Sequence, residues 1–130
     1  MKTFVLTGAA LGALVILSAP GMSLAADADH GQTLFRQQCG VCHMAGAGDG
    51  DGGQGPSLAG VVGRKVGGDT NFSYTQPMMD DKDVWTEGSL AAFLENPQKA
   101  IPGTAMPIRV ASPTDRADLA AYLAKVKPAP

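Results

Sequence analysis

The chain has 130 residues and a net charge of −2 at pH 7, with 10 basic residues against 12 acidic ones. This length suits a single small domain. The lack of a basic excess argues against nucleic acid as a partner, because proteins that bind it carry a basic patch, often with interleaved aromatic side chains. Glycine and proline are frequent, with 17 and 9 residues. The chain is therefore short of apolar side chains, and we expect another group to help fill its core.

Residues 1–25 have the layout of a secretory signal peptide. Lys2 precedes an apolar run over residues 4–17, and small residues then lead to a small-x-small cleavage site at 23–25. The apolar run falls short of the roughly 20 residues that a membrane-spanning helix needs. We therefore expect cleavage after Ala25, export to the periplasm and no stable membrane insertion of the mature chain. One domain over residues 26–130 would remain.

The mature chain begins with a predicted helix. Asp27 is a residue type that caps helix N-termini, and the helix should run from there toward Cys39. Gly31 and Phe35 share one of its faces at helical spacing. The glycine-rich stretch over residues 45–69 then excludes regular structure. It lacks the terminal Glu of a calcium-binding EF-hand loop and the Lys-Ser or Lys-Thr of a phosphate-binding loop.

Two further helices and a short turn complete the expected elements. Thr86 should cap a helix that Pro97 ends, and a helical turn should follow over residues 97–100. The last helix has the clearest start, with Ser112 as its cap and Pro113 in its first turn. Its apolar stripe consists of Leu119, Tyr122, Leu123 and Val126. No strand pattern occurs, so we expect an all-α protein with three to five helices and long loops.

The segment "QQCGVCHM" holds both cysteines of the chain and allows several readings. A disulfide between Cys39 and Cys42 would close a very small loop and stabilise little. A thioredoxin-like redox pair needs a βαβ setting, which the predicted helices do not provide. A structural zinc site wants four ligands, and after His43 only His30 remains. We favour covalent haem attachment through both thiols with His43 as an iron ligand, which also agrees with export.

A haem held by His43 needs a sixth iron ligand, and the methionines are candidates. Two of the six lie in the predicted signal peptide. Met44 adjoins His43 and cannot reach the other haem face. Met78 and Met79 lie in a stretch without a helical pattern, where they would serve as apolar filler. Met106 stands in "IPGTAMP", a loop stiffened by two prolines that can hold a thioether against iron.

The chain resembles the class I c-type cytochromes along nearly all of its mature length, close to mitochondrial cytochrome c and bacterial cytochrome c2. The matching runs are "GQTLFRQQCGVCH", "GPSLAGVVGRK", "FSY", "VW", "FLENP", "IPGTAM" and "DRADLAAYL". The resemblance implies a small cytochrome c fold with helices and loops wrapped around one covalently bound haem.

The resemblance also implies a role for each site residue. Cys39 and Cys42 would hold one haem c by thioethers, and His43 and Met106 would be the axial iron ligands. The Pro56 carbonyl would accept the proton on the other nitrogen of His43 and so fix its tautomer. Three further side chains would surround the inner haem propionate, whose buried charge needs donors: Arg64, Tyr74 and Trp85.

Iron with both His and Met ligands offers no open position to a substrate, so we expect an electron carrier rather than an enzyme. The carrier would shuttle single electrons between membrane-bound or soluble redox proteins in the periplasm, as a monomer. Two alternatives come from other classes. One is a haem enzyme of peroxidase type with a labile Met106, and the other is a haem-free zinc or disulfide module.

Overall fold

The computed structural model describes residues 24–128. Its helical elements are α1 (Ala28–Leu34), η1 (Phe35–Cys39), α2 (Gln76–Asp80), α3 (Glu87–Glu95), α4 (Pro97–Ala100) and α5 (Pro113–Lys125). Within these residues no strand forms, and one isolated bridge joins Lys65 to Val84. The predicted all-α class is confirmed. The predicted signal peptide falls almost wholly on residues 1–23, outside the described part, and stays a prediction.

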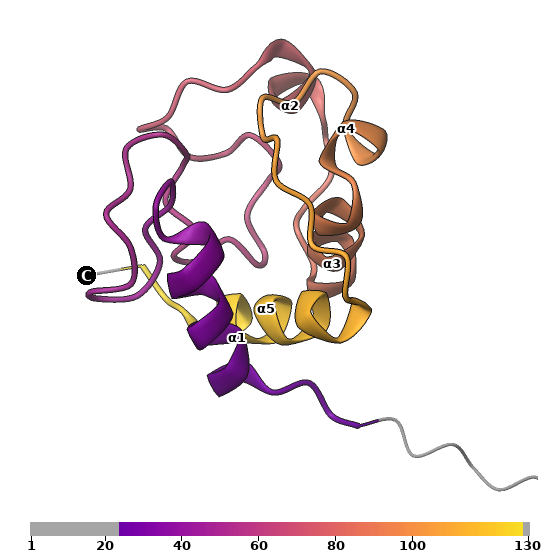
Figure 1. Ribbon diagram of the computed structural model, residues 1–130. Helices are drawn as coiled ribbons and strands as arrows, with labels where there is room; N and C mark the ends of the chain where they lie inside the picture. The colour runs from indigo at the N-terminus through magenta and orange to yellow at the C-terminus, as the bar shows by residue number, and fades with distance from the viewer. Residues whose placement is uncertain (1–23, 129–130) are drawn as a thin grey trace, which may run out of the picture.

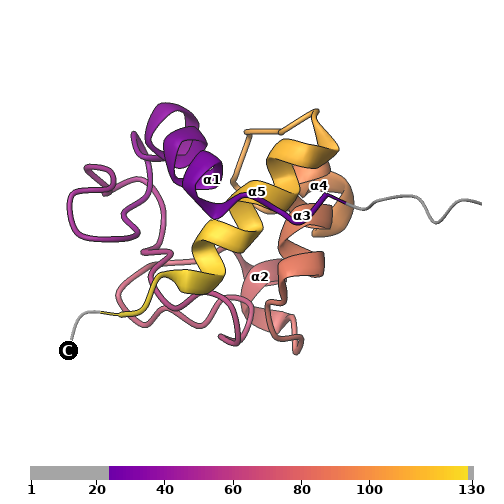
Figure 2. The ribbon, with the colours of Figure 1, turned by 90° about the horizontal axis from the view of Figure 1, so that it is seen from below.

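The helices pack on one another mainly through α5. Figures 1 and 2 show α1 crossing α5, while α3 meets α5 at another point along its length. In the view of Figure 1, α2 lies at the end opposite α5, and irregular chain fills the space between. No helix in the described part of the chain is long and apolar enough to cross a membrane.

The first helix begins where the sequence predicts, because the Asp27 carboxylate accepts hydrogen bonds from the backbone N–H of Asp29 at 3.0 Å and of His30 at 3.1 Å. Its last part differs from the expected α-helix. Residues Phe35–Cys39 form a π-helix, η1, closed by a bond from Gly40 N to Phe35 O of 2.8 Å. Such wider turns are frequent at functional sites, and this one carries the first cysteine.

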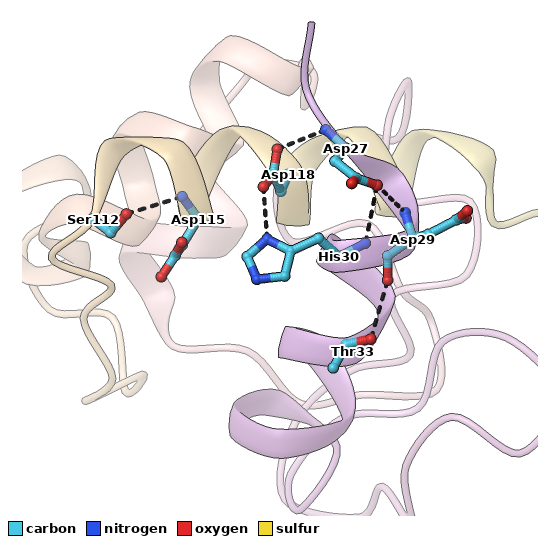
Figure 3. A network of polar contacts seen from close by, with 7 residues as sticks. All are labelled: Asp27, Asp29, His30, Thr33, Ser112, Asp115 and Asp118. Carbon is cyan, nitrogen blue, oxygen red and sulfur yellow. Dashed lines mark hydrogen bonds and ion pairs between the residues drawn. The ribbon is translucent and has the colours of Figure 1, made fainter. Parts of the chain in front are cut away.

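The crossing of α1 and α5 depends on a glycine. A Cβ atom added at Gly31 would lie 2.0 Å from the carbonyl oxygen of Asp118, so only glycine fits. Beside it, the rings of Phe35 and Tyr122 pack with centroids 5.6 Å apart. Figure 3 shows the polar side of the same contact, where His30 Nδ1 and Asp27 N donate to the Asp118 carboxylate at 2.8 and 2.7 Å. Apolar packing and hydrogen bonds thus join the two helices.

The caps of the later helices explain their bounds. Thr86 and Ser89 form a reciprocal capping box at the start of α3. Asn96 is extended and caps α4, which starts at Pro97. At α5, the Ser112 hydroxyl accepts from Asp115 N at 3.1 Å. The predicted starts of these three helices are confirmed. Each cap depends on a contact within three residues, which is why the sequence is sufficient to predict it.

Two expectations were wrong. The stretch around Met78 and Met79 is helix α2, not irregular chain, and it buries Met78 while Met79 stays exposed. A five-residue helix is too short to show a helical pattern in the sequence. In addition, Val126 lies just beyond α5 with extended backbone, although its side chain still packs against the core.

Candidate functional site

One cavity of about 390 Å³ lies between η1, α2, α3, α5 and the loops. Its walls are largely apolar side chains, including Phe35, Leu90 and Leu119. The residues predicted for the site come from six separate segments, and all of them border this cavity: Cys39, Cys42, His43, Pro56, Arg64, Tyr74, Trp85 and Met106. The fold therefore brings the whole predicted set together.

The two cysteines lie about one helical turn apart at this cavity. Both are free thiols and half-buried. Backbone bonds from Cys42 N at 3.0 Å and His43 N at 2.9 Å to Cys39 O close the turn between them. Burial, with a smaller contribution from Cys42, raises the pKa of Cys39 to about 11. At neutral pH this thiol therefore carries its proton.

The structure does not support a zinc site, because His30, the fourth candidate ligand, lies elsewhere. His30 contacts Asp118 on α5 through Nδ1 at 2.8 Å. Among the described residues, no group of three or more His, Cys, Asp or Glu side chains is arranged to hold a metal ion. The thiols of Cys39 and Cys42 face the same cavity instead.

His43 is held in one orientation by its neighbours. Its Nδ1 donates to the Pro56 carbonyl at 2.8 Å, which leaves Nε2 with its lone pair available for a ligand. Burial lowers the pKa of His43, against the opposing effect of the Pro56 bond, so the ring is neutral as a metal ligand requires. A Cβ at Gly55 would lie 2.3 Å from Cε1 of the ring. Sequence reasoning missed this role of Gly55, because it depends on the folded loop.

The polar part of the cavity carries donors without partners. Arg64 donates to Ser57 O at 2.7 Å through Nη2, yet its buried Nε has no hydrogen-bond partner among the described residues. The same holds for the buried hydroxyl of Thr75. The Tyr74 oxygen accepts from Asp69 N at 3.4 Å, which leaves its proton free to donate. Buried polar atoms are nearly always paired, so these donors fit an anionic group such as a carboxylate.

Of the cavity residues Trp85 and Thr75, the sequence analysis identified only Trp85. Trp85 is buried and packs edge-on against Phe93 with ring centroids 5.2 Å apart. Thr75 was missed, since a threonine beside an aromatic residue is common on any surface. Only the burial of its hydroxyl at the cavity distinguishes it.

Two methionines border the cavity, not one. Met106 lies half-buried between Ala105 and Pro107, and Met78 reaches the cavity from α2. Met44 and Met79 are exposed to 50% and 44%. The structure thus reduces the candidate thioethers to Met106 and Met78.

The donor set and the cavity fit a haem: two thiols, a neutral imidazole, a thioether, apolar walls, and unpaired donors for propionates. Comparison with known proteins gives the same picture. The family described as cytochrome c matches residues 28–127. Cytochrome c of Tetrahymena pyriformis is 43% identical over 101 residues, covering 77% of this chain and 89% of the relative.

Other relatives extend the likeness to plants and bacteria. Cytochrome c of Arabidopsis thaliana is 41% identical over 103 residues, or 78% of this chain and 91% of the relative. Cytochrome c2 of Rhodomicrobium vannielii is 38% identical over 117 residues, or 89% of this chain and 91% of the relative. These matches confirm the resemblance read from the motifs. The chain belongs to the cytochrome c family, whose members carry electrons and do not act as enzymes.

Proposed function

We propose that this chain is a monohaem electron carrier of the periplasm. One haem c would be attached through thioethers at Cys39 and Cys42, with His43 and Met106 as the iron ligands. The observation that carries the proposal is the gathering of all predicted site residues around one cavity of about 390 Å³. That volume lies within the range of roughly 300–1,000 Å³ typical of cofactor sites.

Haem supplies a one-electron couple, and the chain supplies its surroundings. The Pro56 carbonyl orients His43 so that Nε2 is the available nitrogen. Leu90, Phe93 and Leu94 exclude water from the apolar side of the cavity. Low polarity disfavours the extra positive charge of the oxidised state, so the reduction potential should be positive.

Arg64, Tyr74 and Thr75 would take the haem propionates. Their donors are buried or half-buried, and two of them have no other described partner. Charge-assisted hydrogen bonds to a carboxylate are about twice as strong as neutral ones, which suits a group that must stay ionised out of water. Trp85 lines the same cavity and would surround the inner propionate together with Arg64 and Tyr74.

Export and partners belong to the same proposal. The signal-peptide layout of residues 1–25 supports a periplasmic location after cleavage. Partners would be membrane-bound or soluble redox proteins that give and receive single electrons. The chain would act as a monomer.

Two variants of the mature protein, produced with haem attachment, test the ligand assignment. We expect one haem per chain by pyridine haemochrome assay and a matching increase in protein mass. Met106→Ala should abolish the methionine-to-iron charge-transfer band of the oxidised protein. Met78→Ala should keep that band, because Met78 serves as buried apolar filler on α2. The reverse pattern would move the ligand to Met78, and absence of covalent haem would refute the function.

A further inference from the structure

A second buried acidic group lies in the loop between His43 and Pro56, and the proposed electron transfer does not use it. Asp49 is 2% exposed. One carboxylate oxygen accepts from Arg36 Nε at 2.5 Å, and the other accepts from Gln32 Nε2 at 2.9 Å and from the hydroxyl of Tyr122. These three donors belong to η1, α1 and α5. A single loop carboxylate therefore contacts three helices.

The carboxylate is ionised and its donors are well matched. Burial alone would raise the pKa of Asp49, but the hydrogen bonds from Tyr122, Gln32 and Arg36 outweigh it and hold the pKa below its usual value. Burial and the bond to Asp49 raise the pKa of Tyr122 to about 12. Tyr122 is therefore a neutral donor, and Asp49 an anion, at any ordinary pH.

The backbone around Asp49 folds back onto His43. Asp49 N donates to Gly46 O at 3.0 Å, and a Cβ at Gly46 would lie 2.8 Å from the Asp49 carboxylate. The next residue, Gly50, has φ of +98°, and its added Cβ would lie 2.1 Å from the His43 carbonyl oxygen. The loop thus has little freedom to shift without moving His43.

We propose that Asp49 is a positioning residue for His43: its carboxylate fixes the loop from His43 to Pro56 against α1, η1 and α5. The Pro56 carbonyl then stays within hydrogen-bond distance of His43 Nδ1, 2.8 Å away. This inference rests on the proposed haem ligation by His43. It assigns Asp49 a local task at the ligand, beyond a general contribution to the stability of the fold.

Asp118 provides a matched control. It is also a buried aspartate, 4% exposed, and it also joins α1 to α5 (Figure 3). Its partners are His30 Nδ1 and Asp27 N, and it makes no hydrogen bond to the loop between His43 and Pro56. A residue that only stabilises the fold should behave like Asp118, and a positioning residue should not.

The experiment compares Asp49→Asn and Asp118→Asn in the reduced, haem-loaded protein. Exchange of the His43 Nδ1 proton is followed by NMR, and the free energy of unfolding is measured by denaturant titration. Asp49→Asn should speed this exchange by about tenfold or more beyond what its loss of global stability explains, because hydrogen bonds to a charged group are lost. Asp118→Asn should speed the exchange only as much as its loss of global stability explains.

Equal behaviour of the two variants would overturn the proposal. If Asp49→Asn does not accumulate as folded protein, Arg36→Ala replaces it, since the Arg36 side chain is 56% exposed and its loss leaves the core intact. Arg36→Ala should speed exchange of the His43 Nδ1 proton less than Asp49→Asn does, but still beyond its effect on global stability. If it does not, the proposal is also overturned. Haem content is measured first, so failure of haem attachment is recognised as failure of the proposed function instead.

Discussion

Replacing Gly31 by alanine tests how closely α1 and α5 pack. A Cβ at this position would lie 2.0 Å from the carbonyl oxygen of Asp118. Ordinary contact between non-bonded heavy atoms is roughly 3.5 Å, so the overlap is about 1.5 Å. The obstacle is the backbone of α5, which cannot rotate away as a side chain would. The two helices must therefore separate.

The expected loss follows from three contributions. Alanine in place of glycine within a helix stabilises by up to about 1 kcal/mol. Overpacking a close contact costs about 1–3 kcal/mol. Separating the Phe35 and Tyr122 rings, now 5.6 Å apart, removes a further ~0.5–1.5 kcal/mol. Because the clash is with backbone, the larger costs apply, and after subtracting the gain from alanine we expect the free energy of unfolding to fall by about 3.5 kcal/mol.

Guanidinium unfolding of the haem-loaded protein measures this change, with Gly88→Ala as the control. Gly88 lies in α3, where an added Cβ would meet only the Thr86 hydroxyl at 3.8 Å. That variant should be as stable as the parent or gain up to about 1 kcal/mol. An unfolding midpoint and slope for Gly31→Ala equal to those of the parent would refute the reasoning from close packing.

Two further predictions concern charge. The hydrogen bond to Asp118, with smaller effects of the charges on Asp118, Asp115 and Asp27, raises the pKa of His30 despite some desolvation. Its contribution is therefore complete below the unfolded pKa of about 6.5 and disappears as pH rises through the folded value. His30→Gln should lower the denaturation midpoint more near pH 5 than near pH 8, and equal losses would contradict this. The exposed residues at the cavity are uncharged: Gln38, Gln54, Ser73, Ala105, Pro107 and Ile108. Association rates with a redox partner, measured by stopped flow, should thus depend only weakly on ionic strength, and a steep fall would count against that surface.

The sequence predicts those parts of the fold that depend on near neighbours. Asp27, Thr86 and Ser112 each cap a helix by accepting from a backbone N–H no more than three residues away. The Cys-x-x-Cys-His segment is equally local, since one turn of chain carries both thiols and the imidazole. Such contacts require no knowledge of the rest of the molecule.

The parts that the sequence does not predict depend on residues far apart in the chain. The Asp49 carboxylate is anchored by Tyr122, 73 residues later, and without the fold Asp49 is one more acidic residue in a glycine-rich loop. The π-turn of η1 also lacks a local signal, because its residues would form an ordinary α-helix equally well. For Gly31 the resemblance already implies close packing against the last helix, and the structure adds that its nearest neighbour there is the carbonyl oxygen of Asp118.

The stability of the fold depends on what fills the cavity of the candidate site. Were its apolar space of about 390 Å³ left to water or vacuum, the known cost of roughly 24 cal/mol per Å³ would amount to about 9 kcal/mol. The open mouth admits water and lowers this figure, yet even a third of it is large beside the total stability of about 5–15 kcal/mol of a small protein. The chain has few aromatic residues and 17 glycines, so its own side chains offer little to offset the loss. A haem attached at Cys39 and Cys42, as proposed above, would fill this space and act as part of the core, so its attachment would contribute directly to the stability of the fold.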